Sequence, residues 1–233
     1  MLGLLGAGAA LAPKPRAARA LGSPRLYAFV PALESTRAIE EILNEGLVGV
    51  AVTAFGRFAD FSAAIASEKP EGALSLADTL RVLGIAPRLQ AEINGSTQEP
   101  YIVLSKDQTD SIAQLAKKAI GAVDIVGRTE LPSLLMRLLG LSESPTVKRV
   151  LKVSDLLPLL HLDLAPAITL PERFLADFQS KSRLNLRILR PGTATLGRAA
   201  LGFPAGRVDQ GMMSALRQAS ASVQSLLGAE GWR

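Results

Sequence analysis

Segments with a strand pattern and segments with a helix pattern alternate along most of this 233-residue chain, and this alternation limits the folds it can adopt. Residues 26–30 and 48–53 are short apolar or β-branched runs, and residues 37–45 between them place apolar side chains on one helical face. Successive strand–helix–strand units of this length form parallel pairs with right-handed crossovers. The sequence therefore predicts an α/β fold with mostly parallel sheets and helices on both faces.

The alternation is interrupted once, at residues 87–104. Asn94-Gly95 separates two strand patterns, residues 87–93 and 97–104, and is the strongest short hairpin signal a sequence can carry. Further on, helices are expected at residues 109–120, 131–139, 155–161, 171–179 and 209–227, and strands at 122–126, 147–153, 165–170, 184–189 and 198–203. One interruption of this kind is typical of a two-lobed α/β protein in which the chain crosses between lobes. Residues 192–197 are expected to form a second crossing or a loop.

The N-terminal segment has the pattern of an export signal. Residues 2–12 are small, apolar and uncharged, too few to span a membrane, and Ala18-Arg19-Ala20 supplies a small-residue cleavage pattern. We therefore expect residues 1–20 to be an export signal, truncated at its start if translation begins upstream, and the working protein to be periplasmic. Two other interpretations are a phosphate-binding loop at Gly3, Gly6 and Gly8, and a frayed tail.

Net charge at first suggests a nucleic-acid partner, because 26 basic against 21 acidic residues give a formal charge of +5. Three of the basic residues and none of the acidic ones lie in residues 1–20, and those that remain are scattered without interleaved aromatic residues. We expect no nucleic-acid partner and a monomer.

Residues suited to catalysis are few. The chain has no cysteine, which excludes thiol catalysis, cysteine zinc sites and iron–sulfur clusters, and it has a single histidine, His161. No nucleophile motif or metal-binding motif accompanies that histidine, so its simplest role is to interact with the dipole at a helix C-terminus. The sequence predicts no enzyme activity, no metal and no cofactor.

Polar side chains instead gather where strands give way to helices. In open α/β sheets, ligands bind outside the carboxyl ends of strands, where helix N-termini present free N–H groups. Each hydroxyl taken alone is most simply a helix cap, but together several such ends favour a cleft that binds a small anionic or zwitterionic molecule. The candidate ligand-binding residues are Ser35, Thr36, Thr53, Ser75, Tyr101, Ser105, Arg128 and Thr129.

An exported α/β chain with this order of elements resembles the type 2 periplasmic solute-binding proteins, and most closely the phosphate- and phosphonate-type binding components of ABC transporters. The segments that carry the resemblance are residues 26–31, 35–46, 48–53, 73–75, 99–105 and 147–170.

The resemblance implies two lobes joined by two crossing strands, with a ligand between them and closure by hinge motion. Residues 24–104 and 190–233 would form one lobe, and residues 105–189 the other. It also implies that the protein captures a small anionic solute for an ABC permease in the inner membrane. A small-molecule enzyme on the same scaffold and an envelope accessory protein that binds no solute remain open as alternatives.

Overall fold

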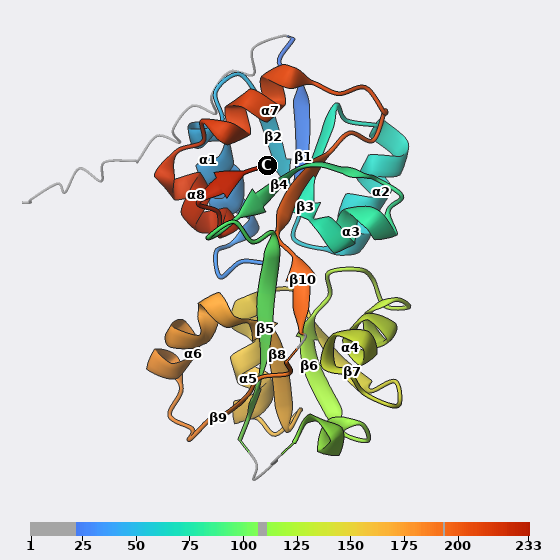
Figure 1. Ribbon diagram of the computed structural model, residues 1–233, viewed down its shortest axis with the longest axis vertical. Coiled ribbons are helices and arrows are strands. Elements are labelled where there is room, and N and C mark those ends of the chain that lie inside the picture. The colour runs from blue at the N-terminus through green and yellow to red at the C-terminus, as the bar shows by residue number, and fades with distance from the viewer. Residues whose placement is uncertain (1–21, 107–110, 193) are drawn as a thin grey trace, which may run out of the picture.

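The computed structural model describes residues 22–106, 111–192 and 194–233, which fold into two lobes, each built on one β-sheet with helices packed on it (Figure 1). The strand order is β12-β4-β11-β3-β1-β2 in the upper lobe of Figure 1 and β10-β5-β8-β6-β7 in the lower lobe, where β9 also pairs with β5. The predicted two-lobed α/β architecture is thereby confirmed. The predicted export signal, residues 1–20, lies outside the described residues.

The upper lobe holds the first and the last part of the chain. Its strands are β1 (Arg25–Phe29), β2 (Ala51–Ala54), β3 (Gly72–Leu76), β4 (Pro87–Glu92), β11 (Ala199–Gly202) and β12 (Gly231–Trp232). Its helices are α1 (Thr36–Gly46), α2 (Phe58–Glu68), α3 (Ala77–Val82), α7 (Gln210–Arg217) and α8 (Ala221–Leu227).

The lower lobe holds the middle of the chain. Its strands are β5 (Gln98–Ser105), β6 (Ala119–Val123), β7 (Thr146–Val150), β8 (Ala167–Pro171), β9 (Arg187–Leu189) and β10 (Thr195–Gly197). Its helices are α4 (Leu131–Leu139), α5 (Leu156–His161) and α6 (Leu175–Lys181), with short 3-10 turns at Ile112–Leu115, Val153–Asp155 and Glu172–Phe174.

Both sheets are mixed rather than mostly parallel. β1 pairs in parallel with β2 and β3, and β6 pairs in parallel with β7 and β8, as strand–helix–strand units require. β11 runs antiparallel to β3 and β4, and β5 runs antiparallel to β8, β9 and β10. The chain leaves each lobe along one strand and returns along another, so strands next to the crossings point in opposite directions.

The Asn94-Gly95 turn is present, but the strands on either side of it do not form the expected hairpin. Asn94 and Gly95 both have positive φ, and only Ile93 and Ser96 form a bridge across the turn. β4 then pairs within the upper sheet, whereas β5 pairs with β8 in the lower sheet. The turn therefore directs the chain into the other lobe.

Sheet membership places both crossings differently from the sequence-based boundaries. β5 and β10 lie side by side in the lower sheet, so residues 98–105 and 195–197 belong to the lower lobe. The chain enters that lobe at residues 97–98 rather than after residue 104, and it returns at residues 197–198 rather than near residue 190. A strand pattern specifies pairing but not the partner sheet.

Several predicted elements have other bounds in the structure, and three of these differences have a clear local cause. The strand expected from residue 48 begins at Ala51, because Gly49 takes a positive φ and leaves Val48 87% exposed. The closing helix expected over residues 209–227 is two helices, since Ser220 caps a new start at α8. Of the helix expected over residues 109–120, the described part is only the 3-10 turn Ile112–Leu115, followed by β6.

The apolar core is continuous from one lobe to the other. One cluster of buried residues lies within the upper lobe, under α1, α7 and α8. A second cluster joins the other face of the upper sheet, including Phe29, Phe61 and Leu80, to the whole core of the lower lobe. The Phe29 ring stacks on Phe61 at 5.7 Å between centroids and meets the edge of Phe58 at 6.2 Å. Apolar packing therefore holds the lobes together as well as filling each of them.

A buried ion cluster lies where the chain crosses between the lobes. The side chain of Glu99, at the start of β5, is 3% exposed and lies 3.3 Å from the guanidinium of Arg198 and 3.6 Å from that of Arg173. Burial raises the pKa of the Glu99 carboxyl above its ordinary value, while the two guanidinium groups act in the opposite direction. Arg198 also donates to the carbonyls of Ser96 and Gly228, so it ties both crossings to the upper lobe.

Replacing Arg198 tests this cluster. The Arg198→Gln variant is expected to lose about 3 kcal/mol of unfolding free energy near neutral pH, because a buried carboxylate loses a cation. Without Arg198, the pKa of Glu99 in the folded protein rises further above its unfolded-state value. A raised folded-state pKa stabilises the fold as the pH falls toward the unfolded-state pKa, so the loss of unfolding free energy should be smaller near pH 5. Urea unfolding at the two pH values measures both effects.

The exposed pair Arg37–Glu41 on α1 supplies the control, because an Arg37→Gln change there should leave stability unaltered at either pH. An equal loss for Arg198→Gln at both pH values would contradict the assignment of Glu99 as its coupled partner.

Candidate functional site: the cleft between the lobes

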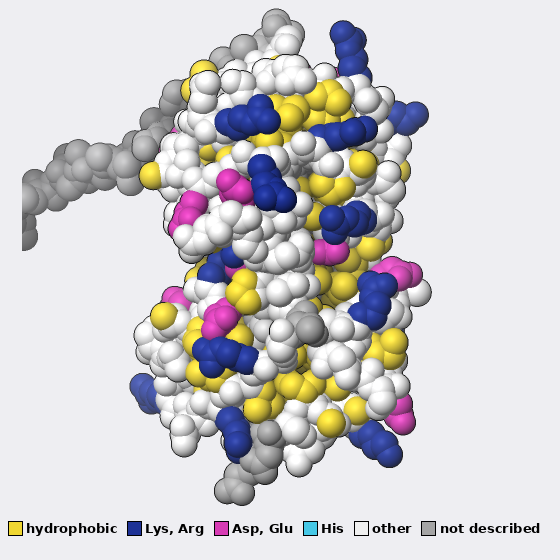
Figure 2. All heavy atoms as spheres, in the orientation of Figure 1, with side chains coloured by type: hydrophobic (Ala, Val, Ile, Leu, Met, Phe, Trp, Pro, Cys, Tyr) yellow, Lys and Arg dark blue, Asp and Glu magenta, His cyan; other side chains and the backbone are white. Residues whose placement is uncertain are grey.

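A groove of about 510 Å³ opens between the lobes, where α3 faces α4. Figure 2 shows hydrophobic side chains at this level, on the right of the waist, with acidic and basic side chains around them. The residues that line the groove are Asp78, Arg81 and Val82 from the upper lobe, Val126, Glu130, Leu134, Arg137 and Leu138 from the lower lobe, and Thr195 and Leu196 from β10. Both lobes and one connecting strand therefore contribute to a single site.

The sequence of α4 places its groove residues on one face. Glu130, Leu134, Arg137 and Leu138 recur at intervals of four, three and one residues, which is one side of a helix. Leu134 and Leu138 are buried, whereas Glu130 and Arg137 are exposed. This face of α4 therefore offers an apolar surface bordered by one acid and one base.

The charged side chains of α3 already have partners, one of them at the crossing between the lobes. Asp78 accepts a hydrogen bond from the Gly197 amide at 2.6 Å and pairs with Arg81 at 3.0 Å. Arg137, on the opposite side of the groove, has no ion-pair partner within the described parts of the chain. Two guanidinium groups from different lobes thus face the same groove, and only one of them is neutralised by a neighbouring acid.

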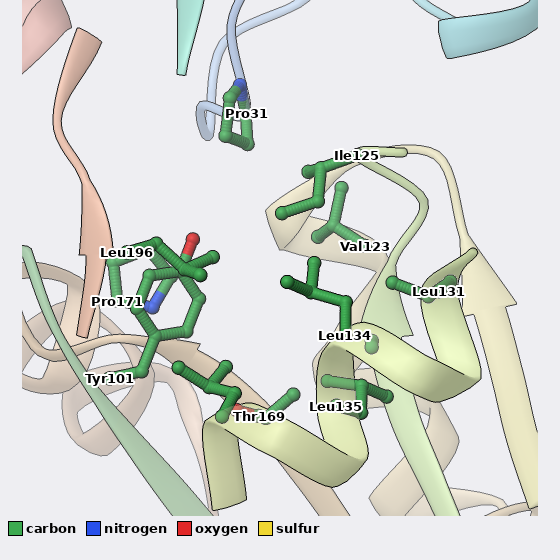
Figure 3. A pocket seen from close by; sticks show the side chains of 12 residues that line it. Pro31, Tyr101, Val123, Ile125, Leu131, Leu134, Leu135, Thr169, Pro171 and Leu196 are labelled. Atoms are coloured by element: carbon green, nitrogen blue, oxygen red, sulfur yellow. The ribbon is translucent and has the colours of Figure 1, made fainter. Parts of the chain in front are cut away.

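A small apolar cavity of about 20 Å³ adjoins the groove. Its lining is Pro31 from the upper lobe and Tyr101, Ala122, Val123, Ile125, Leu131, Leu134, Leu135, Leu138, Thr169, Pro171 and Leu196 from the lower lobe. Figure 3 shows Pro31 on one side of the space and the side chains of α4 and β8 on the other. Because Leu134, Leu138 and Leu196 line both spaces, the groove and the cavity are adjacent parts of one cleft.

Tyr101 brings a polar group into this apolar lining. The residue is 7% exposed, and its ring rises toward Leu196 and the space below Pro31 (Figure 3). Among the described residues, no hydrogen-bond partner of its hydroxyl is found. Burial raises the pKa of Tyr101 further above its ordinary value, so the group stays a neutral donor at physiological pH.

Direct contacts hold the lobes closed on both sides of the cleft. On the groove side, the Thr79 hydroxyl in α3 donates to the Ile125 carbonyl of the lower lobe at 2.9 Å, and this bond is buried. On the other side, Arg173 of the lower lobe donates to the Pro31 carbonyl at 3.5 Å. A Cβ on Gly127 would lie 2.9 Å from the Phe58 ring, so glycine lets the two lobes approach closely there. The two lobes are therefore in direct contact beside the cleft.

Three of the predicted hydroxyls are bonded to the backbone of their own lobe. Ser75 donates to the Phe29 carbonyl at 2.6 Å and joins two strands of the upper sheet. Ser35 accepts from the Ala38 amide as the N-cap of α1. Ser105 donates to the Pro166 carbonyl at the end of β5, at the far end of the lower lobe from the cleft (Figure 1).

Four other predicted residues line neither the groove nor the cavity. Thr36 begins α1 and its hydroxyl faces Gly56 in the connection from β2 to α2. Thr53 lies within β2 beside Tyr27 of β1. Arg128 and Thr129 are exposed in the connection between β6 and α4. Of the eight predicted residues, Tyr101 is the one that lines the described cavity.

Sequence reasoning missed the charged residues of the groove. Asp78 with Arg81, and Glu130 with Arg137, are ordinary solvent-facing spacings on their own helices. The signal that could have pointed to α4 is its apolar face, because Leu134 and Leu138 share that face with the two charges. Nothing in the sequence indicates that α3 lies opposite.

Metal binding and membrane crossing find no support in the described residues. No group of three or more histidine, cysteine, aspartate or glutamate side chains lies close enough there to hold a metal ion. No helix within the same residues is long and apolar enough to cross a membrane.

No protein-family model and no curated protein matches the chain. Solved structures do resemble it. XAC2383 from Xanthomonas citri, solved with chloride ion, has a TM-score of 0.63 at 14% identity, over 90% of this chain and 91% of that one. The same protein bound to ATP gives a TM-score of 0.62 at 14% identity, over 91% of each chain.

Two further structures have the same architecture. The substrate binding protein of an amino acid ABC transporter has a TM-score of 0.54 at 14% identity, over 87% of this chain and 92% of that one. The periplasmic VFT2 domain of BvgS from Bordetella pertussis has a TM-score of 0.53 at 13% identity, over 88% and 93%. The chain thus has the two-lobed fold of solute-binding proteins. Its predicted likeness to the phosphate and phosphonate branch stays a prediction.

The bond between Thr79 and Ile125 makes closure testable. A Thr79→Val change removes the hydroxyl, leaves a buried carbonyl without its donor, and should cost about 1 kcal/mol of closed-state stability. We expect the ligand-free variant to shift toward an open arrangement, seen as a larger radius of gyration in small-angle X-ray scattering.

Thr169→Val is the matched control, because the Thr169 hydroxyl donates to the Ile102 carbonyl within the lower lobe. That change should lower thermal stability without altering the radius of gyration. Identical scattering from both variants would show that the bond does not hold the lobes together.

Proposed function

We propose that the chain is a periplasmic solute-binding protein that holds a small anionic solute between its lobes and presents it to an ABC permease. The observation that carries the proposal is the groove of about 510 Å³, because its lining comes from both lobes. A volume of this size suits a small ligand. A molecule that touches α3 and α4 at once binds the closed arrangement better than an open one, which is what couples binding to closure.

The charges of the groove favour an anion. Arg81 and Arg137 face it from opposite lobes, and a carboxylate or phosphate between two guanidinium groups accepts charge-assisted hydrogen bonds from each. Arg81 already pairs with Asp78, so Arg137 is the residue with the most to gain from an incoming anion. Glu130 on the same helix face gives a zwitterion a place for its ammonium group, which makes amino acids the second ligand class.

Transport is the favoured role for such a site, in line with a structural neighbour that is the substrate binding protein of an amino acid ABC transporter. A periplasmic location fits the neighbouring BvgS domain, which is itself periplasmic. We propose binding without turnover, because the groove residues include no nucleophile paired with a general base. A phosphate or phosphonate group is one of the anions that the two arginines suit.

The proposal is tested by replacing Arg137. We expect a thermal-shift screen of phosphate, phosphonates, sulfonates, carboxylates and amino acids to find a stabilising anion. Its affinity, measured by isothermal titration calorimetry, should fall by about tenfold or more in Arg137→Gln, because a hydrogen bond to a charged group is lost.

The control is Arg217→Gln on α7, an exposed arginine that does not line the cleft. This variant should bind the same anion as tightly as the unmodified protein. If no anion stabilises the protein, or if both variants weaken binding equally, the groove is not the solute site.

A further inference from the structure

We propose that the solute is amphipathic, with a short apolar arm that enters the cavity beside the groove and ends in an acceptor for the Tyr101 hydroxyl. The inference rests on the proposed function, since the groove has to hold the charged part of the same molecule. It adds a second recognition site, of different chemistry, and assigns Tyr101 to it.

The path from groove to cavity is apolar. Leu134 and Leu138 of α4 and Leu196 of β10 line both spaces, so a ligand in the groove lies against the same side chains that enclose the cavity. Beyond them the cavity presents mostly carbon, from aliphatic residues of β6 and α4, from Ile125 and from two prolines. A wholly polar solute would leave this surface unused, whereas an apolar arm would be removed from water against it.

Tyr101 supplies a hydroxyl that a ligand in the cavity can reach. No hydrogen bond joins this hydroxyl to another described residue, and it is not among the fully enclosed polar atoms that lack a partner, so it keeps some exposure and is free to donate to an incoming acceptor. The other hydroxyl in the lining, that of Thr169, already donates to the Ile102 carbonyl. The Pro31 carbonyl, across the space, already accepts from Arg173. Within the described lining, Tyr101 is therefore the side chain that selects for a polar atom on the arm.

The size of the cavity limits the arm. A volume of about 20 Å³ holds a single group the size of a water molecule or a methyl. Only one small group at the end of the arm, such as a carbonyl oxygen or a methyl, therefore fits, and a long chain or a large ring would have to force the leucines of α4 apart.

Three carboxylates that differ only in the arm test the inference: acetate, hexanoate and 5-oxohexanoate. We expect the affinity measured by calorimetry to rise from acetate to hexanoate, because the arm buries apolar surface. Tyr101→Phe should then lower the affinity for 5-oxohexanoate by about fivefold and the affinity for hexanoate by less than twofold. Only the ketone oxygen accepts the hydrogen bond that this variant loses.

The same variant gives a second readout without ligand. Tyr101→Phe keeps the ring and removes only the unpartnered hydroxyl, so the ligand-free variant should be as thermally stable as the unmodified protein or more so. A lower melting temperature would mean that the hydroxyl has a structural partner, and it would overturn the assignment.

The remaining outcomes separate this inference from the proposed function. If acetate binds in an Arg137-dependent way and neither longer acid binds more tightly, the result supports the anion site in the groove and contradicts the apolar subsite. Equal losses of hexanoate and 5-oxohexanoate in Tyr101→Phe would also overturn the subsite. If none of the three acids binds and the wider anion screen is negative, both proposals fall.

Discussion

The rest of the structure depends on how the two crossings between the lobes are fixed. Glu99 lies at the start of one crossing and Arg198 at the end of the other, and the buried ion pair between them joins the two strands at their point of entry. Asp78 holds the second crossing from the side by accepting the Gly197 amide. Charges buried at this depth are stable only when paired and hydrogen-bonded, so the hinge has one well-defined geometry. That geometry sets which helices face each other across the cleft.

Closure of the lobes then depends on whether apolar surfaces pack against each other across the cleft or remain exposed to water. The continuous core and the close approach of Phe58 to Gly127 both favour contact between the lobes. A solute need only add interactions that exist in the closed arrangement, since equal binding to both arrangements shifts nothing. The groove between α3 and α4 offers such interactions, because neither half of it is a site by itself.

Much of the fold could be predicted from local pattern, and the errors have a common cause. The alternation of strands and helices, the turn at Asn94-Gly95 and the existence of two lobes follow from periodicity and turn chemistry. The hairpin, the lobe boundaries and the mostly parallel sheets were wrong because they depend on which sheet receives each strand. The hydroxyls of Ser75 and Ser105 show the same limit, because their distant carbonyl partners are brought within reach only by the folded chain.

The sequence by itself determined the elements, the absence of cysteine chemistry and the apolar face of α4, because these follow from residue type and spacing along the chain. Only the tertiary structure decided which side chains form the cleft. Arg81 and Arg137 lie on separate helices in separate lobes. Tyr101 is a buried strand residue like its neighbours, and it lines a cavity only because Pro31 of the other lobe lies across the space beside it. A site between two lobes is made from contacts that no local pattern encodes, and the hinge is what brings them together.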